Sequence, residues 1–203
     1  HLTIIDGNNV VAQVRRHTAA LGLSLKLLYS LSESAAKSYA AQQGISLSDM
    51  PRIKGWGHRS SAIDLRSKLR LSDGQPLLFP HVNQLIRDAL KRADMTDLLQ
   101  LDGLEVHDCF SITEYTVIDH CGLTAPGESW KAIEEGRICK DGDFPVNASG
   151  GLIGLGHPVG ATGVRMLLDC YKQVSGQAGE TQITNAKNMA TFNLGGSATT
   201  CAS

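Results

Sequence analysis

The stretch Asn147-Ala-Ser-Gly-Gly-Leu-Ile-Gly-Leu-Gly-His-Pro-Val-Gly-Ala-Thr-Gly163 decides how the rest of the chain is interpreted. It holds six glycines in seventeen residues, with His157 between Gly156 and Pro158. Glycine permits positive φ and the close approach of other groups. Proline fixes its own φ and biases the residue before it toward an extended backbone. We therefore expect the imidazole of His157 on a stiff, tightly turned loop.

A helix is expected directly after this loop. Four apolar residues follow at helical spacing, namely Val164, Leu167, Leu168 and Tyr171. This spacing predicts a helix that begins just after Thr162. Free N–H groups at the start of a helix favour negative charge. His157 beside such an end is a candidate acid, base or hydrogen-bond donor to an oxyanion.

Two other interpretations of the glycine-rich stretch stay open. One is a tight strand-to-helix turn with no chemical role. The other is dinucleotide binding, because Gly154-Leu-Gly156 begins like a G-x-G-x-x-G fingerprint. That fingerprint fits poorly, since the third glycine, Gly160, comes one residue late and no acidic residue follows about 20 positions on at the end of a strand.

Composition places the chain among ordinary globular proteins. Its 203 residues are 42% hydrophobic, which is enough for a real core. Nineteen basic and twenty acidic residues give a net charge of −1, so we expect neither a nucleic-acid nor a membrane-surface partner. No apolar run reaches the length of about 18 residues that spans a bilayer, and the first residues do not resemble a signal peptide. The expected location is cytoplasmic.

The cysteines predict free thiols. They are five in number and include no C-x-x-C pair, which fits neither a disulfide framework nor a zinc site. We therefore expect no metal, and a packing or surface role for Cys121, Cys139, Cys170 and Cys201.

A coarse pattern of elements precedes the first motif. Ser32–Gly44 has the cap, composition and terminating glycine of a helix. Pro51–His58 is expected to form a strand, with a domain boundary near residue 50, and 59–75 to be irregular. Pro80–Ala93 predicts an amphipathic helix with Val82, Leu85, Ile86 and Leu90 on its apolar face.

The second motif, His107-Asp108-Cys109-Phe110, is expected at a junction between a strand over 101–107 and a helix over 112–121 that Gly122 ends. Ligands of α/β sheets usually bind at such junctions. The other expected elements are a short helix over 130–136, a hairpin-like segment over 137–144, a helix over 164–174, and an antiparallel strand pair over 188–194 and 197–203 joined at a double glycine.

Three motifs together carry a family resemblance. In this order, His107-Asp-Cys-Phe, Gly156-His-Pro and Phe192-Asn-Leu-Gly-Gly-Ser resemble the C-terminal half of the thiolase superfamily. The branch is the one typified by sterol carrier protein thiolases and related bacterial and archaeal acetyl-CoA acetyltransferases. The resemblance implies an α/β fold in αβαβα layers. It also implies a thiolase C-terminal domain over 51–203 and the end of the N-terminal domain over 1–50.

The resemblance implies a role for each matched residue. His157 would take the proton from a nucleophilic cysteine and help to hold the thioester oxygen, while His107 would complete that first oxyanion hole. Cys109 would be the acid/base that protonates the acetyl-CoA carbanion or removes its α-proton. Gly195 would contribute its N–H to a second oxyanion hole. Other branches use a cysteine in a terminal Cys-x-Gly motif, which here is Asn193-Leu-Gly195, in agreement with Cys109 as the acid/base.

The implied activity is acyl transfer between a 3-ketoacyl-CoA and CoA, or condensation of acetyl-CoA units, within fatty acid and lipid metabolism. Coenzyme A thioesters would be substrates, with no tightly bound cofactor. Thiolases are dimers or tetramers, so a homo-oligomer is expected. The chain departs from the family at Ala19–Leu28 and contains neither the motif of the nucleophilic cysteine nor the CoA-binding loop domain. It is therefore expected to be inactive without an N-terminal thiolase half. A non-catalytic thiolase-like subunit and a thiolase-like retro-aldolase component are the alternatives.

Overall fold

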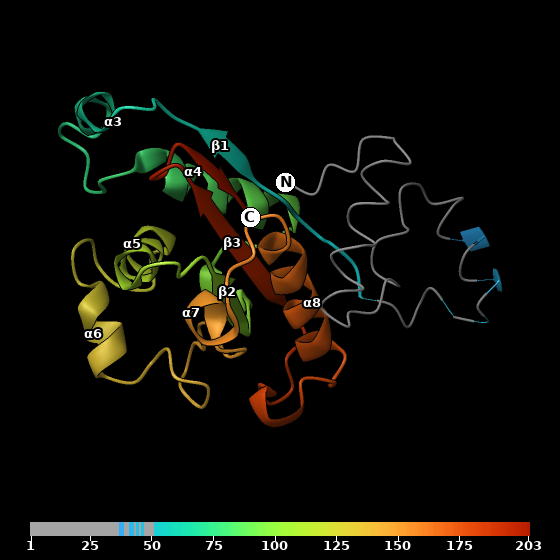
Figure 1. Ribbon diagram of the computed structural model, residues 1–203. Helices are drawn as coiled ribbons and strands as arrows, with labels where there is room; N and C mark the ends of the chain where they lie inside the picture. Colours follow the sequence, from blue (N-terminus) through green and yellow to red (C-terminus); the bar gives the residue numbers. More distant parts are fainter. Residues whose placement is uncertain (1–36, 39–40, 43, 45, 47–50) are drawn as a thin grey trace.

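The computed structural model describes residues 37–38, 41–42, 44, 46 and 51–203 (Figure 1). Within these residues a four-stranded sheet has the strand order β1-β4-β3-β2. β3 pairs in parallel with β2 and antiparallel with β4, and β4 pairs antiparallel with β1. In chain order the strands are β1 (His58–Ser60), β2 (Gly103–Val106), β3 (Met189–Gly195) and β4 (Thr200–Ala202).

The pairing of β2 with β3 sets which side chains face which side. Leu104 lies opposite Ala190 and Val106 lies opposite Phe192. Because side chains alternate along a strand, these residues face one side, while Glu105 and its partner Thr191 face the other. The sheet thus has an apolar side and a side that carries a buried carboxyl group.

Helices cover both sides of the sheet (Figure 1). The helix α8 (Thr162–Val174) packs on β3 at the side of Glu105, whereas α4 (Pro80–Arg92) and α5 (Ser111–Cys121) lie on the apolar side. The fold class is therefore α/β, as expected. The remaining elements are α3 (Leu65–Leu71), α6 (Ser129–Glu134), α7 (Gly151–Leu155) and the 3-10 turns η3 (Leu98–Gln100) and η4 (Gly179–Thr181).

The core lies between the apolar side of the sheet and the helices α4 and α5. The predicted apolar face of α4 is buried there, with Leu90 partly buried. The other large contributors to this cluster are Leu104, Val106, Val117, Ile118, Phe144 and Phe192.

Most expected elements from residue 80 onward are confirmed. The helix from Pro80, the strand before His107 and the helix after it all form, and Gly122 ends α5 with a φ of 83°. The terminal strand pair is antiparallel, as expected. All five cysteines are free, and only Cys139 is exposed.

Three expectations were wrong. Of Pro51–His58, only His58 lies in a strand, although Gly57 already exchanges backbone hydrogen bonds with Ser203. The glycines of this segment instead lie directly against the backbone of α4, where a side chain would collide. Residues 59–75 contain β1 and α3 instead of irregular structure, since Asp64 accepts a hydrogen bond from the N–H of Ser67 at 2.8 Å and caps α3. The segment 137–144 consists of turns without strand pairing, closed by the bond from Phe144 N to Arg137 O at 3.0 Å.

Expectations for the first 50 residues fall mostly outside the described residues. Of the helix expected over Ser32–Gly44, residues 37, 38, 41 and 42 are described and helical, and Gly44 has a φ of 61°. The departure from the family at 19–28 lies outside the described residues. Across the part that the structure describes, no helix has the length and apolar character needed to cross a membrane.

The location of the core predicts the cost of truncating Phe192, whose side chain is 1% exposed. Phe192→Ala is expected to lower the free energy of unfolding by about 3–5 kcal/mol, because it removes a large buried side chain and leaves a cavity. Phe110→Ala is the matched control, since Phe110 is 70% exposed, and is expected to change it by about 0.5 kcal/mol or less. Urea unfolding measures both. Equal losses would contradict this location of the core.

Candidate active site

Two imidazoles meet at the end of β2. The rings of His107 and His157 lie 4.8 Å apart between centroids and are almost perpendicular, at 88°. His107 directly follows β2, and its N–H donates to Phe192 O at 2.9 Å, which continues the ladder between β2 and β3. His157 lies on the short loop between α7 and α8. The structure thus brings together the histidines of two motifs that are 50 residues apart in the chain.

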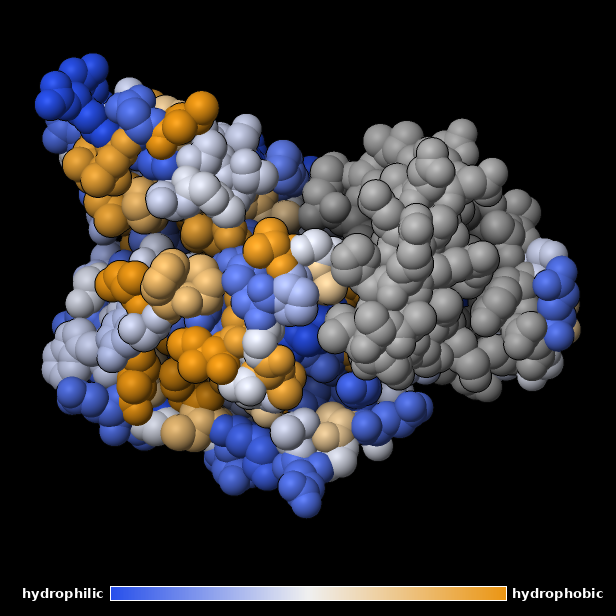
Figure 2. All heavy atoms as spheres, viewed as in Figure 1, coloured by the Kyte–Doolittle hydropathy of each residue, from blue (hydrophilic) through white to orange (hydrophobic). Residues whose placement is uncertain are grey.

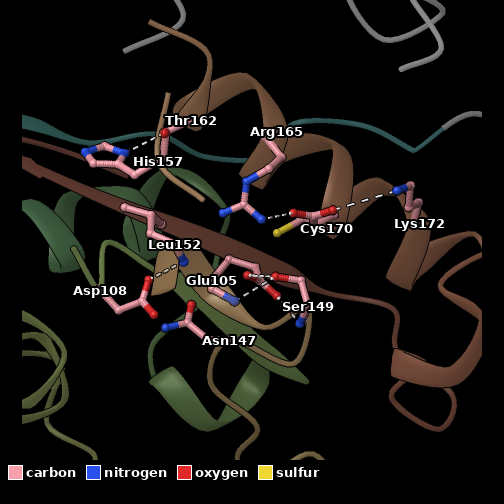
Figure 3. A network of polar contacts seen from close by, with 12 residues as sticks. Glu105, Asp108, Asn147, Ser149, Leu152, His157, Thr162, Arg165, Cys170 and Lys172 are labelled. Carbon is pink, nitrogen blue, oxygen red and sulfur yellow. Dashed lines mark hydrogen bonds and ion pairs between the residues drawn. The ribbon is translucent and has the colours of Figure 1, made fainter. Parts of the chain in front are cut away.

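Thr162 determines which nitrogen of His157 is available. The Nδ1 atom of His157 lies 2.7 Å from Oγ1 of Thr162, as Figure 3 shows. The hydroxyl of Thr162 donates its hydrogen to Pro158 O at 3.1 Å, so it can only accept from the imidazole. The neutral ring therefore carries its proton on Nδ1. Its Nε2 atom is left with a lone pair, as a general base requires.

The environment of His107 favours the neutral ring. Burial lowers the pKa of His107, the nearby His157 lowers it further, and the side chains of Asn193 and Asp108 act in the opposite direction. Its Nδ1 atom is buried and has no hydrogen-bond partner among the described residues. A proton on that nitrogen would be left unsatisfied, so the ring is expected to carry its proton on Nε2. His107 is then a donor where His157 is an acceptor.

The other two predicted site residues, Cys109 and Gly195, lie close in the chain to His107 and to Asn193. Cys109 is partly buried two residues beyond His107, and its sulfur lies 3.9 Å from Oγ1 of Thr113 near the start of α5. Gly195 ends β3 two residues after Asn193, so both residues face the side of α8. A side chain at Gly163 in α8 would touch the amide group of Asn193, which places that amide at the start of α8.

Asp108 joins the loop after β2 to the glycine-rich stretch. Its carboxylate accepts a hydrogen bond from the N–H of Leu152 at 2.6 Å, at the start of α7 (Figure 3). It also accepts from the N–H of Ile153 at 3.5 Å. Gly151 has a φ of 62°, and a side chain there would collide with this carboxylate. Glycine at 151 is therefore required by both the backbone and the space. No local pattern in the sequence indicates a role for Asp108, because its hydrogen-bond partners lie 44 and 45 residues away.

Glu105 makes a second link between β2 and the glycine-rich stretch. Glu105 is fully buried, and its carboxylate accepts bonds from the N–H of Ser149 at 3.1 Å and from its hydroxyl at 2.6 Å (Figure 3). Burial raises the pKa of Glu105 to about 7, with a smaller contribution in the same direction from Asp169. The bonds from Ser149 and the charge of Arg165 act in the opposite direction.

Asn147 makes a third link between β2 and the glycine-rich stretch. Its side-chain oxygen accepts from the N–H of Val106 at 2.7 Å, and its own N–H donates to Leu104 O at 2.8 Å. Its φ is 54°, a backbone conformation that Asn tolerates better than most residues. These links hold the loop with His157 against the strand with His107.

Comparisons with known proteins show the family of this chain. A family model described as thiolase C-terminal domain-like matches residues 66–203. The chain is 42% identical over 116 residues to an acetyl-CoA acetyltransferase of Methanothermobacter thermautotrophicus, a match that covers 57% of this chain and 30% of that protein. It is 38% identical over 153 residues to sterol carrier protein 2 of Oryctolagus cuniculus, covering 70% of this chain and 28% of that protein.

A solved structure described as an Ltp2-ChsH2(DUF35) aldolase has a TM-score of 0.58 and 14% sequence identity, and the match covers 95% of this chain and 61% of that one. At this identity the match shows likeness of fold alone.

The chain therefore belongs to the thiolase C-terminal domain-like family, and the predicted family is confirmed. It spans less than a third of the length of the two curated relatives, at 30% and 28%. The roles of His107, Cys109, His157 and Gly195, and the domain bounds at 50 and 51, stay predictions.

The raised pKa of Glu105 predicts how stability depends on pH. The folded state holds the Glu105 proton up to about pH 7, whereas the unfolded chain releases it near the ordinary pKa of 4.5. This group therefore stabilises the fold most below pH 4.5, and the contribution is lost between pH 4.5 and about 7. Over this range the loss is about 3 kcal/mol.

Glu105→Gln tests this dependence, because the amide has a similar shape and does not titrate. At about pH 5 the variant and the parent chain should have similar free energies of unfolding. At about pH 8 the variant should be the more stable by up to about 3 kcal/mol. Urea unfolding at the two pH values makes the comparison. A parent chain that is more stable than the variant at the higher pH would contradict the assignment.

Proposed function

We propose that the chain is the C-terminal half of a thiolase-type acyltransferase, which transfers an acyl group between a 3-ketoacyl-CoA and CoA. In this proposal 51–203 is the C-terminal domain, and 1–50 is the end of the N-terminal domain. The observation that carries it is the pair of converging imidazoles, 4.8 Å apart, with opposite hydrogen-bonding roles. The archaeal relative is named acetyl-CoA acetyltransferase, which agrees with this chemistry.

The proposed first step uses the lone pair of His157. Its Nε2 atom takes the proton from a cysteine thiol that the N-terminal half supplies, and the thiolate attacks the keto carbon of the substrate. The two imidazoles then donate hydrogen bonds to the oxygen that becomes negative. Such a donor typically contributes about two to three orders of magnitude in rate.

The proposed second step breaks the carbon–carbon bond. Its electron pair moves to the α-carbon of acetyl-CoA, which is stabilised as an enolate by the N–H of Gly195. The thiol of Cys109 gives its proton to this carbon, and the free acetyl-CoA leaves. The acyl group stays on the nucleophilic cysteine until the thiol of CoA attacks it. The Cys109 thiolate takes the proton of this thiol, and His157 returns its proton to the cysteine that leaves.

The surface around the site supports a missing half. Figure 2 shows apolar side chains gathered over the face that carries α5 and α7. A contiguous apolar surface of this kind usually marks an interaction site. The large apolar residues on or next to α5 and α7 that are more than half exposed are Phe110 at 70%, Ile112 at 68%, Ile153 at 66%, Leu155 at 56% and Val159 at 84%.

A chimera tests the proposal. The first half of the archaeal acetyl-CoA acetyltransferase, joined to residues 51–203 of this chain, is expected to cleave acetoacetyl-CoA when CoA is present. Loss of the enolate absorbance measures this reaction. A folded chimera that leaves acetoacetyl-CoA intact, while the parent archaeal enzyme cleaves it, would contradict the proposal. Retro-aldol cleavage of a 3-hydroxyacyl-CoA by the chimera would assign it to the lyase alternative.

Within an active chimera, two cysteine variants form a matched pair. Cys109→Ser is expected to lower kcat by about two to four orders of magnitude, because a serine hydroxyl is a far weaker acid. Cys139→Ser changes an exposed cysteine and is expected to leave kcat unchanged within about twofold. His157→Asn should cause a loss similar to that of Cys109→Ser. Equal rates for the two serine variants would contradict the role of Cys109.

A further inference from the structure

The turn between β3 and β4 has an unusual backbone. Gly196, Ser197 and Ala198 follow one another with φ values of 57°, 53° and 64°. Only glycine adopts this left-handed region without strain, and it occurs mostly as single residues. Strained residues persist where the surroundings hold them, and they are concentrated at functional sites. This turn begins directly after Gly195.

A buried lysine holds this turn. Lys68 of α3 is 2% exposed, and its Nζ atom donates to Ser197 O at 2.7 Å, to Thr199 Oγ1 at 2.9 Å and to Gly196 O at 3.4 Å. An ammonium group has three N–H donors and no acceptor, so these three oxygens match it completely. The Thr199 hydroxyl donates its own hydrogen to Gly196 O, which leaves its lone pairs for the lysine.

His81 completes the cluster from α4. Its Nε2 atom lies 2.7 Å from Ala198 O, and because a carbonyl only accepts, the imidazole donates. All three carbonyls of the left-handed residues are therefore used by side chains from two different helices. Among the described residues, the hydrogen-bond partners of the Lys68 ammonium are neutral oxygens, as in a site for a monovalent cation.

Burying an ammonium group against neutral oxygens is costly compared with an apolar side chain that fills the same space. Packing alone therefore does not account for a lysine at this position. The charge has a direct effect on the turn, since it draws the carbonyls of Gly196 and Ser197 to one point. That arrangement sets the path of the chain as it leaves β3.

We propose that the turn over 196–199 is a cation-binding turn whose cation is the Lys68 ammonium, and that Lys68 thereby positions the backbone N–H of Gly195. Lys68 is a positioning residue, since it contacts the turn and not the reacting atoms. The effect on catalysis rests on the proposed function, in which that N–H stabilises the enolate. The cation-binding turn itself does not depend on it.

The first experiment measures the thermal midpoint Tm of the chain. Lys68→Met is expected to lower Tm by about 5 °C or more, whereas Lys91→Met, at an exposed lysine of α4, is expected to change it by less than about 2 °C. Lys68→Ala leaves space for an external cation. Ammonium or potassium chloride should reverse part of the decrease in Tm of this variant. Tetramethylammonium chloride at equal ionic strength should not.

Two outcomes of this experiment would overturn the cation-binding turn. One is a Lys68→Met variant that is as stable as the Lys91→Met control. The other is a Lys68→Ala variant that gains as much from tetramethylammonium as from potassium or ammonium. Thr199→Val covers the case in which the Lys68 variants do not fold, because it removes one of the three oxygens and keeps the lysine. Hydrogen exchange of the amides over 195–199 should be at least about tenfold faster in that variant, and unchanged exchange would overturn the proposal.

The second experiment uses the active chimera and separates the positioning role from a general loss of stability. Below the Tm of each variant, Lys68→Met and Thr199→Val are expected to lower kcat by about tenfold or more with KM unchanged, because the Gly195 N–H acts on the transition state. Variants with a lower Tm and an unchanged kcat would overturn the positioning role. A chimera without any thiolase activity contradicts the proposed function instead, and Tm and hydrogen exchange then decide the claim about the turn.

Discussion

The hydrogen bonds from Leu152 and Ile153 to the carboxylate of Asp108 hold α7 against the end of β2, and the geometry of the site depends on this contact. His107 is fixed by the sheet, because its N–H continues the ladder to β3. His157 follows α7 by two residues, so its position is only as definite as that of α7. The collision that a side chain at Gly151 would cause shows how closely the two segments approach.

On the side of the sheet that faces α8, burial removes ionisable groups from water. A low-dielectric environment disfavours charge, which lowers the pKa of His107 and raises that of Glu105 to about 7. In its neutral form each imidazole has one donor and one acceptor nitrogen, and the neighbouring groups determine which nitrogen carries the proton. Thr162 makes this choice for His157 through a hydroxyl whose hydrogen is already given to Pro158.

The parts of the fold that were predicted correctly depend on local patterns. The apolar spacing along α4 and α8, and the glycine that ends α5, are visible within about ten consecutive residues, and each element formed as expected. The meeting of His107 and His157 was implied by a family resemblance carried by motifs and not by spacing. The contacts of Asp108, Glu105 and Lys68 join residues 44, 44 and about 130 positions apart, and no local pattern indicates them. Residues 51–57 were mispredicted as a strand, because the packing of their glycines on α4 is not visible in a local pattern.

The central claim is that the two imidazoles, in their neutral forms, carry their protons on different nitrogens. Nitrogen-15 NMR of the histidine rings measures this directly on the chain as it is. The neutral ring of His157 is predicted to be protonated on Nδ1 and that of His107 on Nε2, with a pKa of His107 below its ordinary value of 6.5. The same tautomer on both rings, or a pKa of His107 above 6.5, would contradict the account.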